Sequence, residues 1–452
     1  MARTKLKARS TPRGKAADAA VAAAAGAPST SPAAARWSST ESSAPSWPAT
    51  SWIGHKGAAS TDLRSEFPPP PPLVARGQAV GNGAWRSSTD IGTVGDTMTT
   101  PTAAMLEAIV TCTLRDDVFE EDDSTSSLER HVAELAGMEA GLFVLSGTMG
   151  NQLAMRSLLT QPPYSVLCDH RSHIVQYEAG GLTGAHVKTV VPGNARYLTL
   201  EDIEKSVVLS DDVHACPTRV ISLENTLNGV IMPLAEARRI AAFARAHGIR
   251  LHCDGARLWE AVASGAGALP DFCRLFDTVS LCFSKGLGAP VGSVLVGSAP
   301  TLRHARWVRK SIGGGLRQPG LLTAAARVAV DQTFGTSPDG QQGLLRLSHD
   351  VAKKVEALWT DRGGTLVHPV ETNMCWLDLD AAGCSAQRFE ELGREQGLTI
   401  AGNRLVTHYQ IAQNADDVLP RLQNVFEKVF AEGGSGKTEH EVGVKSMYQT
   451  KK

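Results

Sequence analysis

The 452-residue sequence lacks any apolar run near the roughly 20 residues that a membrane-spanning helix needs, so no membrane partner is expected. It also lacks an excess of positive or negative charge. The net charge is −1, which predicts no nucleic-acid-binding surface. Its eight cysteines form no Cys-x-x-Cys pair or zinc-ligand cluster, which favours reduced thiols in an intracellular protein and predicts no metal site. What remains, 42% hydrophobic and 20% charged residues, is typical of soluble enzymes.

The N-terminal segment is poor in acids. Residues 1–60 hold only Asp18 and Glu41, are rich in Ala, Ser, Thr and Pro, and begin with a cluster of basic residues. This composition predicts a transit peptide, a disordered extension or a misassigned gene start, and not a secretory signal. Five prolines at 68–72 predict a linker. We therefore expect residues 1–90 and the polar tail 433–452 to be disordered, and a cytoplasmic or mitochondrial location.

From residue 91, apolar helical patterns alternate with short β-branched runs, which predicts an α/β fold with a mostly parallel sheet in a large domain over 91–335. The expected helices of that domain are 102–114, 126–137, 151–159 and 234–247. Its expected strands are 140–145, 164–168, 187–191, 220–223, 250–253, 278–283 and 292–296. A smaller α+β domain is expected over 336–432, with helices 343–362 and 415–431 and strands 365–367, 374–379, 398–401 and 404–408.

Parallel sheets bind ligands at the carboxyl ends of their strands, so the residues that follow each strand are the candidates for a site. Ser146-Gly147-Thr148 lies between an apolar strand and a helix, where backbone N–H groups suit a phosphate, although a plain turn is the alternative. Asp254 ends another strand and could keep a pyridine nitrogen protonated, or could simply cap a turn. Arg257 follows it and suits a carboxylate or a ring oxygen.

Lys285 follows the apolar run 279–283 and has small neighbours, Ser284 and Gly286. Partial burial there would lower the pKa of the ammonium and make it a competent Schiff-base nucleophile. Lys285 comes 31 residues after Asp254, about one αβ unit, so the two side chains are expected on neighbouring strands. A phosphate turn, an acid and a lysine in this order indicate a pyridoxal-phosphate (PLP) enzyme.

Nine segments of the chain, spread over residues 96–430, resemble the L-threonine aldolase family. These are fold-type I PLP enzymes of the beta-eliminating lyase group, with a large PLP-binding domain and a smaller C-terminal domain. The matching segments are 96–101, 116–119, 146–148, 173–178, 222–226, 254–257, 284–286, 313–317 and 404–408.

The resemblance implies a cofactor role for five of the matched residues. Lys285 would be the Schiff-base lysine and Asp254 the partner of the pyridine nitrogen. Gly147 and Thr148 would bind the phosphate. His173 would stack on the cofactor ring and assist proton transfer at the substrate hydroxyl.

The resemblance also implies contacts to a small amino-acid substrate. Arg257 and Arg404 would hold its carboxylate, and Asp96 and Glu178 would lie on the substrate side, with Glu178 either catalytic or orienting. Arg317 would reach a PLP phosphate, in the neighbouring subunit. Family members are dimers or tetramers with shared active sites, so a homo-oligomer is expected.

Two positions depart from the family pattern. Gly95 stands where the family usually has a serine that contacts the substrate carboxylate, and Leu227 stands where many members have a histidine near the substrate hydroxyl. The expected reaction is cleavage of threonine or a related β-hydroxy amino acid to glycine and an aldehyde. An alanine racemase of the same family, which needs no group at the hydroxyl, is the alternative, and an inactive PLP-fold scaffold is the third.

Overall fold

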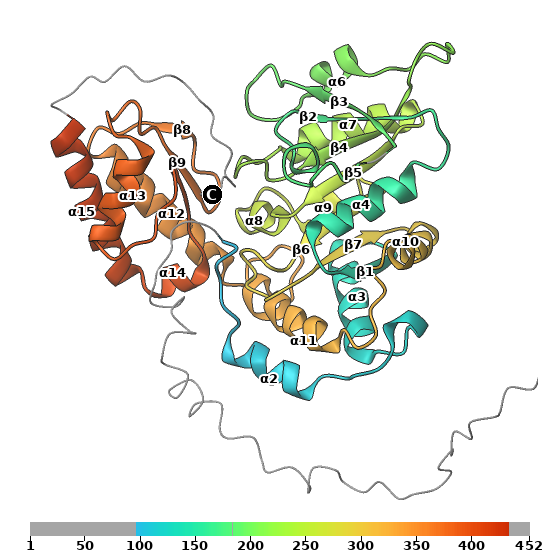
Figure 1. The fold of residues 1–452 in the computed structure, drawn as a ribbon, viewed down its shortest axis with the longest axis horizontal. Helices are drawn as coiled ribbons and strands as arrows, with labels where there is room; N and C mark the ends of the chain where they lie inside the picture. The colour runs from blue at the N-terminus through green and yellow to red at the C-terminus, as the bar shows by residue number, and fades with distance from the viewer. Residues whose placement is uncertain (1–95, 183, 434–452) are drawn as a thin grey trace, which may run out of the picture. The chain divides into compact units, whose positions relative to one another are not determined.

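The structure, a computed structural model, describes residues 96–182 and 184–433 (Figure 1). The predictions made for residues 1–95, including the Gly95 departure, and for residues 434–452 lie outside the described residues. Within the described part, no helix combines the length and apolarity needed to cross a membrane.

A seven-stranded sheet forms the centre of the larger part of the fold (Figure 1). Its strands are β1 Ala140–Val144, β2 Ser165–Asp169, β3 His186–Val190, β4 Thr218–Glu224, β5 Arg250–Gly255, β6 Thr278–Cys282 and β7 Ser293–Gly297. Their order is β1-β7-β6-β5-β4-β2-β3, and only β7 runs against its neighbours. The carboxyl ends of the other six strands therefore emerge at the same edge, as the prediction of a mostly parallel sheet requires.

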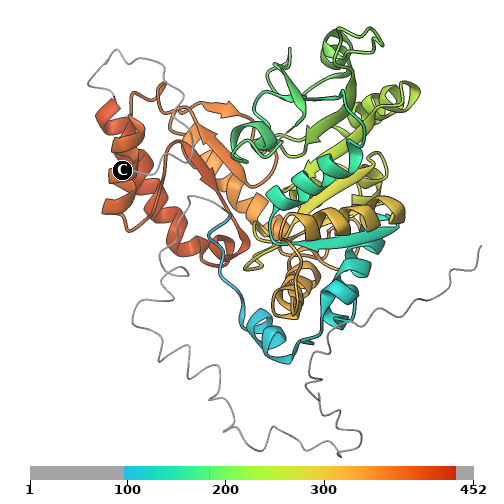
Figure 2. The same ribbon diagram turned by 45° about the vertical axis from the view of Figure 1, so that its right-hand side comes forward.

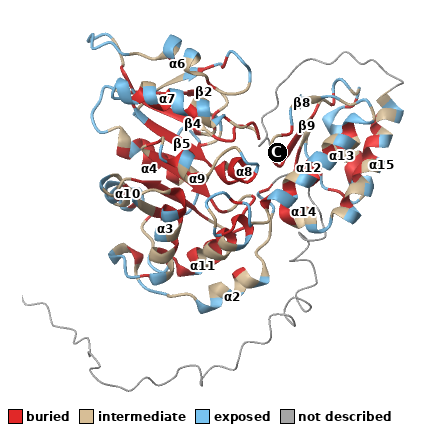
Figure 3. Ribbon diagram, turned by 180° about the vertical axis from the view of Figure 1, so that it is seen from behind, coloured by how far each residue is buried: buried red, intermediate tan, exposed pale blue. Residues whose placement is uncertain are grey.

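Helices cover both faces of this sheet, because alternate strand residues point to opposite sides. In β1, Leu142 and Val144 pack toward α4 Gly147–Leu158 and α10 Ala299–Ser311, whereas Phe143 packs on the other face. That other face is covered by α3 Asp123–Ala136, α7 Leu234–Ala246, α8 Leu258–Ala263, α9 Leu269–Cys273 and α11 Gly320–Ala329. Figure 3 shows the buried strands between helices whose outer surfaces are exposed.

The remaining helices of this part are short or lie at its margin. They are α2 Ala103–Thr111, the turns Asp117–Phe119 and Val330–Phe334, α5 His173–Gln176 and α6 Leu200–Ser206. The helix predicted to start at residue 151 begins four residues earlier, at Gly147, because the Ser146 side chain caps it by accepting from the Met149 N–H (3.1 Å). This earlier start places the helix N-terminus directly at the end of β1.

A second, antiparallel sheet of three short strands lies near the C-terminus, in the order β10-β9-β8 (Figures 1 and 2). The strands are β8 Leu366–His368, β9 Met374–Leu377 and β10 Arg404–Val406, and the accompanying helices are α12 Leu345–Thr360, α13 Ala386–Glu395, α14 Tyr409–Gln413 and α15 Ala415–Gly433. These elements share an apolar core of their own, which includes Trp359, Phe389 and Phe426. The sheet-and-helix arrangement is the predicted α+β pattern.

Two predictions in this region, a strand over 398–401 and a tail that starts at residue 433, were wrong. Residues 398–401 form no strand of either sheet. The Leu398 N–H bonds the Gly393 carbonyl (2.8 Å), and Leu398 and Ile400 are buried in the core. Thr399 forms no more than an isolated bridge, so the apolar alternation there reflects packing and not an extended strand. Gly433, the first residue of the predicted tail, is the last residue of α15.

Candidate active site

The carboxyl ends of five strands bring five of the chemically important segments to one edge of the sheet. Gly147 follows β1, His173 follows β2, Glu224 ends β4, Asp254 lies at the end of β5 and Lys285 follows β6. Glu224 pairs with Asp254 across β4 and β5 and accepts from the His173 N–H (2.9 Å); burial raises the pKa of Glu224 to about 8, the Asp254 charge raises it further, and the Lys285 charge opposes this. The two side chains predicted on neighbouring strands, Asp254 and Lys285, therefore do lie at one edge.

Lys285 sits on a tight turn that is fixed from several sides. Its carbonyl accepts from the Gly288 N–H (2.8 Å) and from the Thr99 hydroxyl (3.4 Å). Any side chain at Gly286 would force the buried Glu260 to move, because a Cβ atom there would lie 2.0 Å from its Oε1. The turn thus holds the lysine backbone firmly and leaves the partly buried side chain to the site.

A buried amide, Asn151, orients the two carboxylates beneath the site. Its Nδ2 donates to Asp254 Oδ2 (2.8 Å) and to Glu178 Oε1 (2.7 Å). His252 fixes the amide from behind, with Nε2 3.0 Å from Asn151 Oδ1 and Nδ1 2.9 Å from the Thr278 hydroxyl. Burial lowers the pKa of His252 to about 4, so the ring is neutral, donates through Nε2 and accepts at Nδ1.

His173 is held by the same network. Its Nδ1 lies 2.9 Å from Glu178 Oε1, Gln152 Nε2 donates to the other Glu178 oxygen (3.2 Å), and the His173 N–H donates to Glu224 (2.9 Å). Burial lowers the pKa of His173, but the Glu178 hydrogen bond and the charges of Asp254 and Glu178 outweigh it and raise that pKa above its ordinary value. The ring therefore presents Nε2 to a ligand while Nδ1 stays on Glu178.

Ligand atoms of His173, Glu178 and Asp254 lie within 4.8 Å of one another, a spacing that a metal ion could use. The Asn151 amide, however, points its hydrogens at both carboxylates. The amide hydrogens already satisfy one oxygen of each carboxylate. The cluster is better suited to orient Asp254 and His173 than to bind a metal.

The N-terminus of α4 offers the anion site that the sequence predicted. The first N–H groups of a helix have no acceptor within it, and the Ser146 side chain takes only that of Met149. Space is open next to Gly147, since the nearest atom to a Cβ there would be the Ser293 hydroxyl at 3.8 Å. That hydroxyl is buried and has no hydrogen-bond partner among the described residues. An unsatisfied hydroxyl and free helix N–H groups, including that of Thr148, fit a phosphate.

Arg257 and Asp96 form a buried, two-point ion pair. Arg257 Nε and Nη2 donate to the two Asp96 oxygens, each at 2.7 Å, and Asp96 is fully buried. Burial raises the pKa of Asp96, but Arg257 outweighs this and, with Lys285 and Arg404, keeps that pKa well below its usual range. Asp96 therefore positions Arg257, and Arg404 lies close enough to act on the same carboxylate.

Arg317 is the predicted site residue that stands apart. Its side chain is 57% exposed and pairs with Asp116, and its carbonyl accepts from the Asp117 N–H (3.0 Å). Among the contacts of the described residues, none joins Arg317 to Asp254 or Lys285. The structure of one chain thus brings together the other predicted site residues, but not this one.

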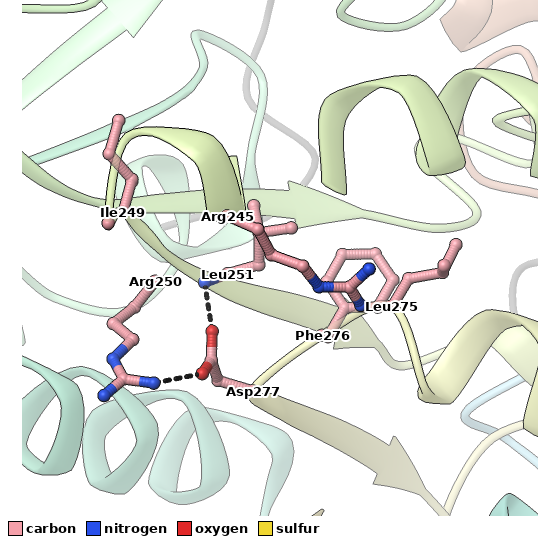
Figure 4. A pocket seen from close by; sticks show the side chains of 8 residues that line it. Arg245, Ile249, Arg250, Leu251, Leu275, Phe276 and Asp277 are labelled. Atoms are coloured by element: carbon pink, nitrogen blue, oxygen red, sulfur yellow. Dashed lines mark hydrogen bonds and ion pairs between the residues drawn. The ribbon is translucent and has the colours of Figure 1, made fainter. Parts of the chain in front are cut away.

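A surface pocket at the opposite end of the strands has no part in this arrangement (Figure 4). It lies where β5 and β6 begin, and Arg250 and Leu251 N–H both bond the Asp277 carboxylate in it (2.7 and 2.8 Å). These contacts tie two strand starts together. The pocket therefore lies at the edge of the sheet away from Lys285.

Four residues of the network escaped the sequence analysis as functional residues: Asn151, Gln152, Glu224 and His252. Asn151 and Gln152 lie in the first turns of α4, and their polar character on the buried side of a helix was the available signal. His252 and Asp254 alternate along β5 and share one face of the sheet.

The site contains a lysine, a carboxylate held in place by Asn151, a histidine held by Glu178 and a helix N-terminus for a phosphate, all at strand ends of one sheet. This donor set fits PLP and defines the class of a PLP-dependent enzyme. The beta-eliminating lyase family model matches residues 94–382. The chain belongs to the beta-eliminating lyase family and is a PLP-dependent lyase.

Named relatives share much of the sequence. An aldolase, vrtJ, from Penicillium aethiopicum is 54% identical over 75% of this chain and 86% of its own length. The alanine racemase TOXG of Cochliobolus carbonum is 47% identical over 70% of this chain and 82% of its own. A low-specificity L-threonine aldolase of Eremothecium gossypii is 45% identical, over 71% and 83%.

A solved structure shares the fold. The threonine aldolase of Leishmania major superposes with a TM-score of 0.64 at 21% identity, covering 75% of this chain and 99% of that chain. The predicted fold-type I architecture, a mostly parallel sheet with a smaller antiparallel sheet beside it, is confirmed.

Proposed function

We propose that the protein cleaves L-threonine, L-allo-threonine or a related β-hydroxy-α-amino acid to glycine and an aldehyde. The observation that carries this proposal is the His173–Glu178 pair (2.9 Å) beside Asp254, a base held next to the ring-nitrogen carboxylate. The names of several relatives, an aldolase and L-threonine aldolases among them, support the same activity.

When bound, PLP supplies an electron sink for the electrons of the broken Cα–Cβ bond. Lys285 would hold the cofactor covalently through its side-chain amine. Asp254, oriented by Asn151 and by the Ala256 N–H (3.1 Å), would keep the pyridine nitrogen protonated. Gly147 and Thr148 would bind the phosphate through the α4 N-terminus.

His173 would take the proton from the substrate hydroxyl. Its Nδ1 is committed to Glu178, so Nε2 is the nitrogen that receives the proton. The resulting imidazolium is stabilised by Glu178 and Asp254, whose charges already raise the pKa of His173. Glu178, predicted on the substrate side, has a fully buried side chain, and we propose that it orients His173.

Arg257 and Arg404 would hold the substrate carboxylate. Asp96 fixes the Arg257 fork through Nε and Nη2, which leaves Nη1 for the substrate. Arg404 extends from β10 toward the same carboxylate environment. We propose that Asp96 acts through Arg257 and does not contact the substrate.

A second candidate, alanine racemisation, is favoured by one feature. Leu227, 4% exposed, replaces the histidine that the resemblance expects, and it offers no group for a substrate hydroxyl. A relative at 47% identity is named an alanine racemase. An inactive scaffold, the third candidate, gains no support from a chain that keeps both Lys285 and Asp254.

Product analysis separates the two activities. The PLP-loaded protein is incubated with L-threonine, L-allo-threonine and L-alanine, with Lys285→Ala as the control. Equal amounts of glycine and acetaldehyde from either threonine isomer are the expected result. D-alanine from L-alanine, without glycine from threonine, would replace the aldolase proposal by the racemase.

We propose further that the active enzyme is a homodimer or homotetramer with shared active sites. Arg317 would serve the partner's phosphate, since its exposed side chain is paired only with Asp116 in the described contacts. Apolar side chains are exposed on the segments around it, including Phe119 (69%), Val110 (68%) and Leu321 (45%). Exposed apolar surface of this kind is typical of subunit interfaces.

We also propose a cytoplasmic or mitochondrial location, which rests on the acid-poor composition of residues 1–60. A C-terminal tag would report it. Import into mitochondria with loss of the N-terminal segment would support the transit peptide, and a full-length, diffuse cytosolic protein would remove it.

A further inference from the structure

One turn of the large sheet domain borders the site and is closed at its base. Leu227 and Val230 exchange both backbone hydrogen bonds (3.2 and 3.0 Å), with Asn228 and Gly229 at the tip in left-handed conformations (φ +54° and +83°). Asn-Gly is the pair that such a tight turn favours. The turn follows Asn225, whose N–H donates to the Asp254 carbonyl (3.0 Å), so one of its ends is fixed to the strand of the ring-nitrogen carboxylate.

Three side chains from residues 371–376 hold this 227–230 turn by its backbone. Trp376 Nε1 donates to the Asn228 carbonyl (2.9 Å), the Thr372 hydroxyl donates to the Gly229 carbonyl (3.1 Å), and Glu371 accepts from the Ile231 N–H (2.8 Å). A Cβ at Gly229 would lie 2.8 Å from Met374, so the turn also packs tightly on β9. The position of the turn is therefore set by β9 and the residues just before it.

Trp376 makes a second contact, with Arg404. The two residues are direct cross-strand partners in β9 and β10, and the guanidinium carbon of Arg404 lies 5.7 Å from the indole centroid. An arginine over an indole face is stabilised by a cation–π interaction. The same rigid indole ring thus contacts Arg404 with its face and donates its N–H to the 227–230 turn.

We propose that Trp376 is a positioning residue that sets the distance between Arg404 and the 227–230 turn. The turn follows β4, is bonded through Asn225 to the Asp254 carbonyl and meets Trp376 at its tip, so it links the ring-nitrogen carboxylate to the arginine for the substrate carboxylate. In this arrangement the substituent on the substrate Cβ would lie between the turn and Arg404. Trp376 therefore controls carboxylate affinity through its ring and tolerance of the Cβ substituent through its N–H. The proposal rests on the proposed function only in taking Arg404 as a carboxylate contact.

The test separates the ring from the N–H by two substitutions. Trp376→Phe keeps an aromatic face under Arg404 and removes the N–H, whereas Trp376→Leu removes both. Glycine, titrated into the PLP-loaded protein and followed by absorbance, reports the carboxylate contact alone, because it has no Cβ. Trp376→Leu is expected to raise the glycine Kd about 10-fold, and Trp376→Phe by less than about 3-fold.

The kinetics of L-threonine cleavage measure the effect of the hydrogen bonds that hold the 227–230 turn. Trp376→Phe and Thr372→Val each remove one hydrogen bond to it and are expected to raise KM about 5-fold with little change in kcat. Trp307, which is 74% exposed on α10, provides matched controls: Trp307→Phe and Trp307→Leu should change neither quantity.

Two results would overturn the proposal. One is a Trp376→Leu protein that is less stable but binds glycine within about 2-fold of wild type, which would make the residue merely structural. The other is a Trp376→Phe protein that loses glycine affinity as much as Trp376→Leu. If threonine is not cleaved by the wild type, the proposed function fails, while the glycine titrations still decide the role of Trp376.

Discussion

Replacing Asn151 by leucine removes the amide that joins the two carboxylates of the site. Asp254 and Glu178 each lose a buried hydrogen-bond donor (2.8 and 2.7 Å), and His252 loses its acceptor. A buried hydrogen bond to a charged group contributes about 1.5–3 kcal/mol, so the two carboxylate bonds together predict a loss of about 3–6 kcal/mol in the free energy of unfolding. The variant should also bind PLP more weakly, because Asp254 is no longer held toward the ring nitrogen.

Urea unfolding of the PLP-free protein measures the first effect, and absorbance titration with PLP measures the second. Asn424→Leu is the matched control, since Asn424 is exposed on α15 and bonds only Gln396 (3.2 Å) among its described contacts; its unfolding free energy should change by less than about 0.5 kcal/mol. An Asn151→Leu protein within about 1 kcal/mol of wild type, with unchanged PLP affinity, would refute the orienting role.

Three further predictions concern the cofactor, the base and the subunits. Gly147→Ala should fold with normal stability, since the nearest atom to the new Cβ is 3.8 Å away, but should bind PLP less tightly because the methyl group enters the phosphate space; unchanged PLP affinity would contradict this. Glu178→Gln should move the acidic limb of the kcat/KM profile to lower pH, because Glu178 raises the pKa of His173 and the neutral ring is the active form; an unmoved limb would exclude this pairing as the cause. Mixed Lys285→Ala and Arg317→Ala subunits should regain about a quarter of wild-type activity, since half of randomly formed dimers carry one intact site; no recovery would refute the shared site.

The sequence alone was sufficient for the features whose signal is local. The apolar run before Lys285, the strand that ends at Asp254 and the strand–turn–helix at Gly147 each lie within a few consecutive residues, and the alternation of such segments predicts the parallel sheet. The structure shows all three at one sheet edge. Helix boundaries were less accurate because a capping side chain, Ser146, decides where α4 begins.

The residues that were missed act through contacts between distant parts of the chain. Asn151 meets Asp254 across 103 positions and His252 across 101, and Arg257 meets Asp96 across 161. No local pattern encodes such pairings, because they depend on how α4 crosses the sheet and where the segment before α2 returns to β5. The role of Trp376 is of the same kind, since its two partners come from β10 and from the 227–230 turn.

The most direct test of the central claim is to locate the cofactor on the chain. Borohydride reduction of the PLP-loaded protein fixes PLP covalently to its lysine, and peptide mass mapping then identifies the residue. The account predicts the modification on Lys285, with less of it on that peptide in Asn151→Leu protein at limiting PLP. Modification of a different lysine, or of none, would contradict a PLP site built from the strand ends around Asp254 and Lys285.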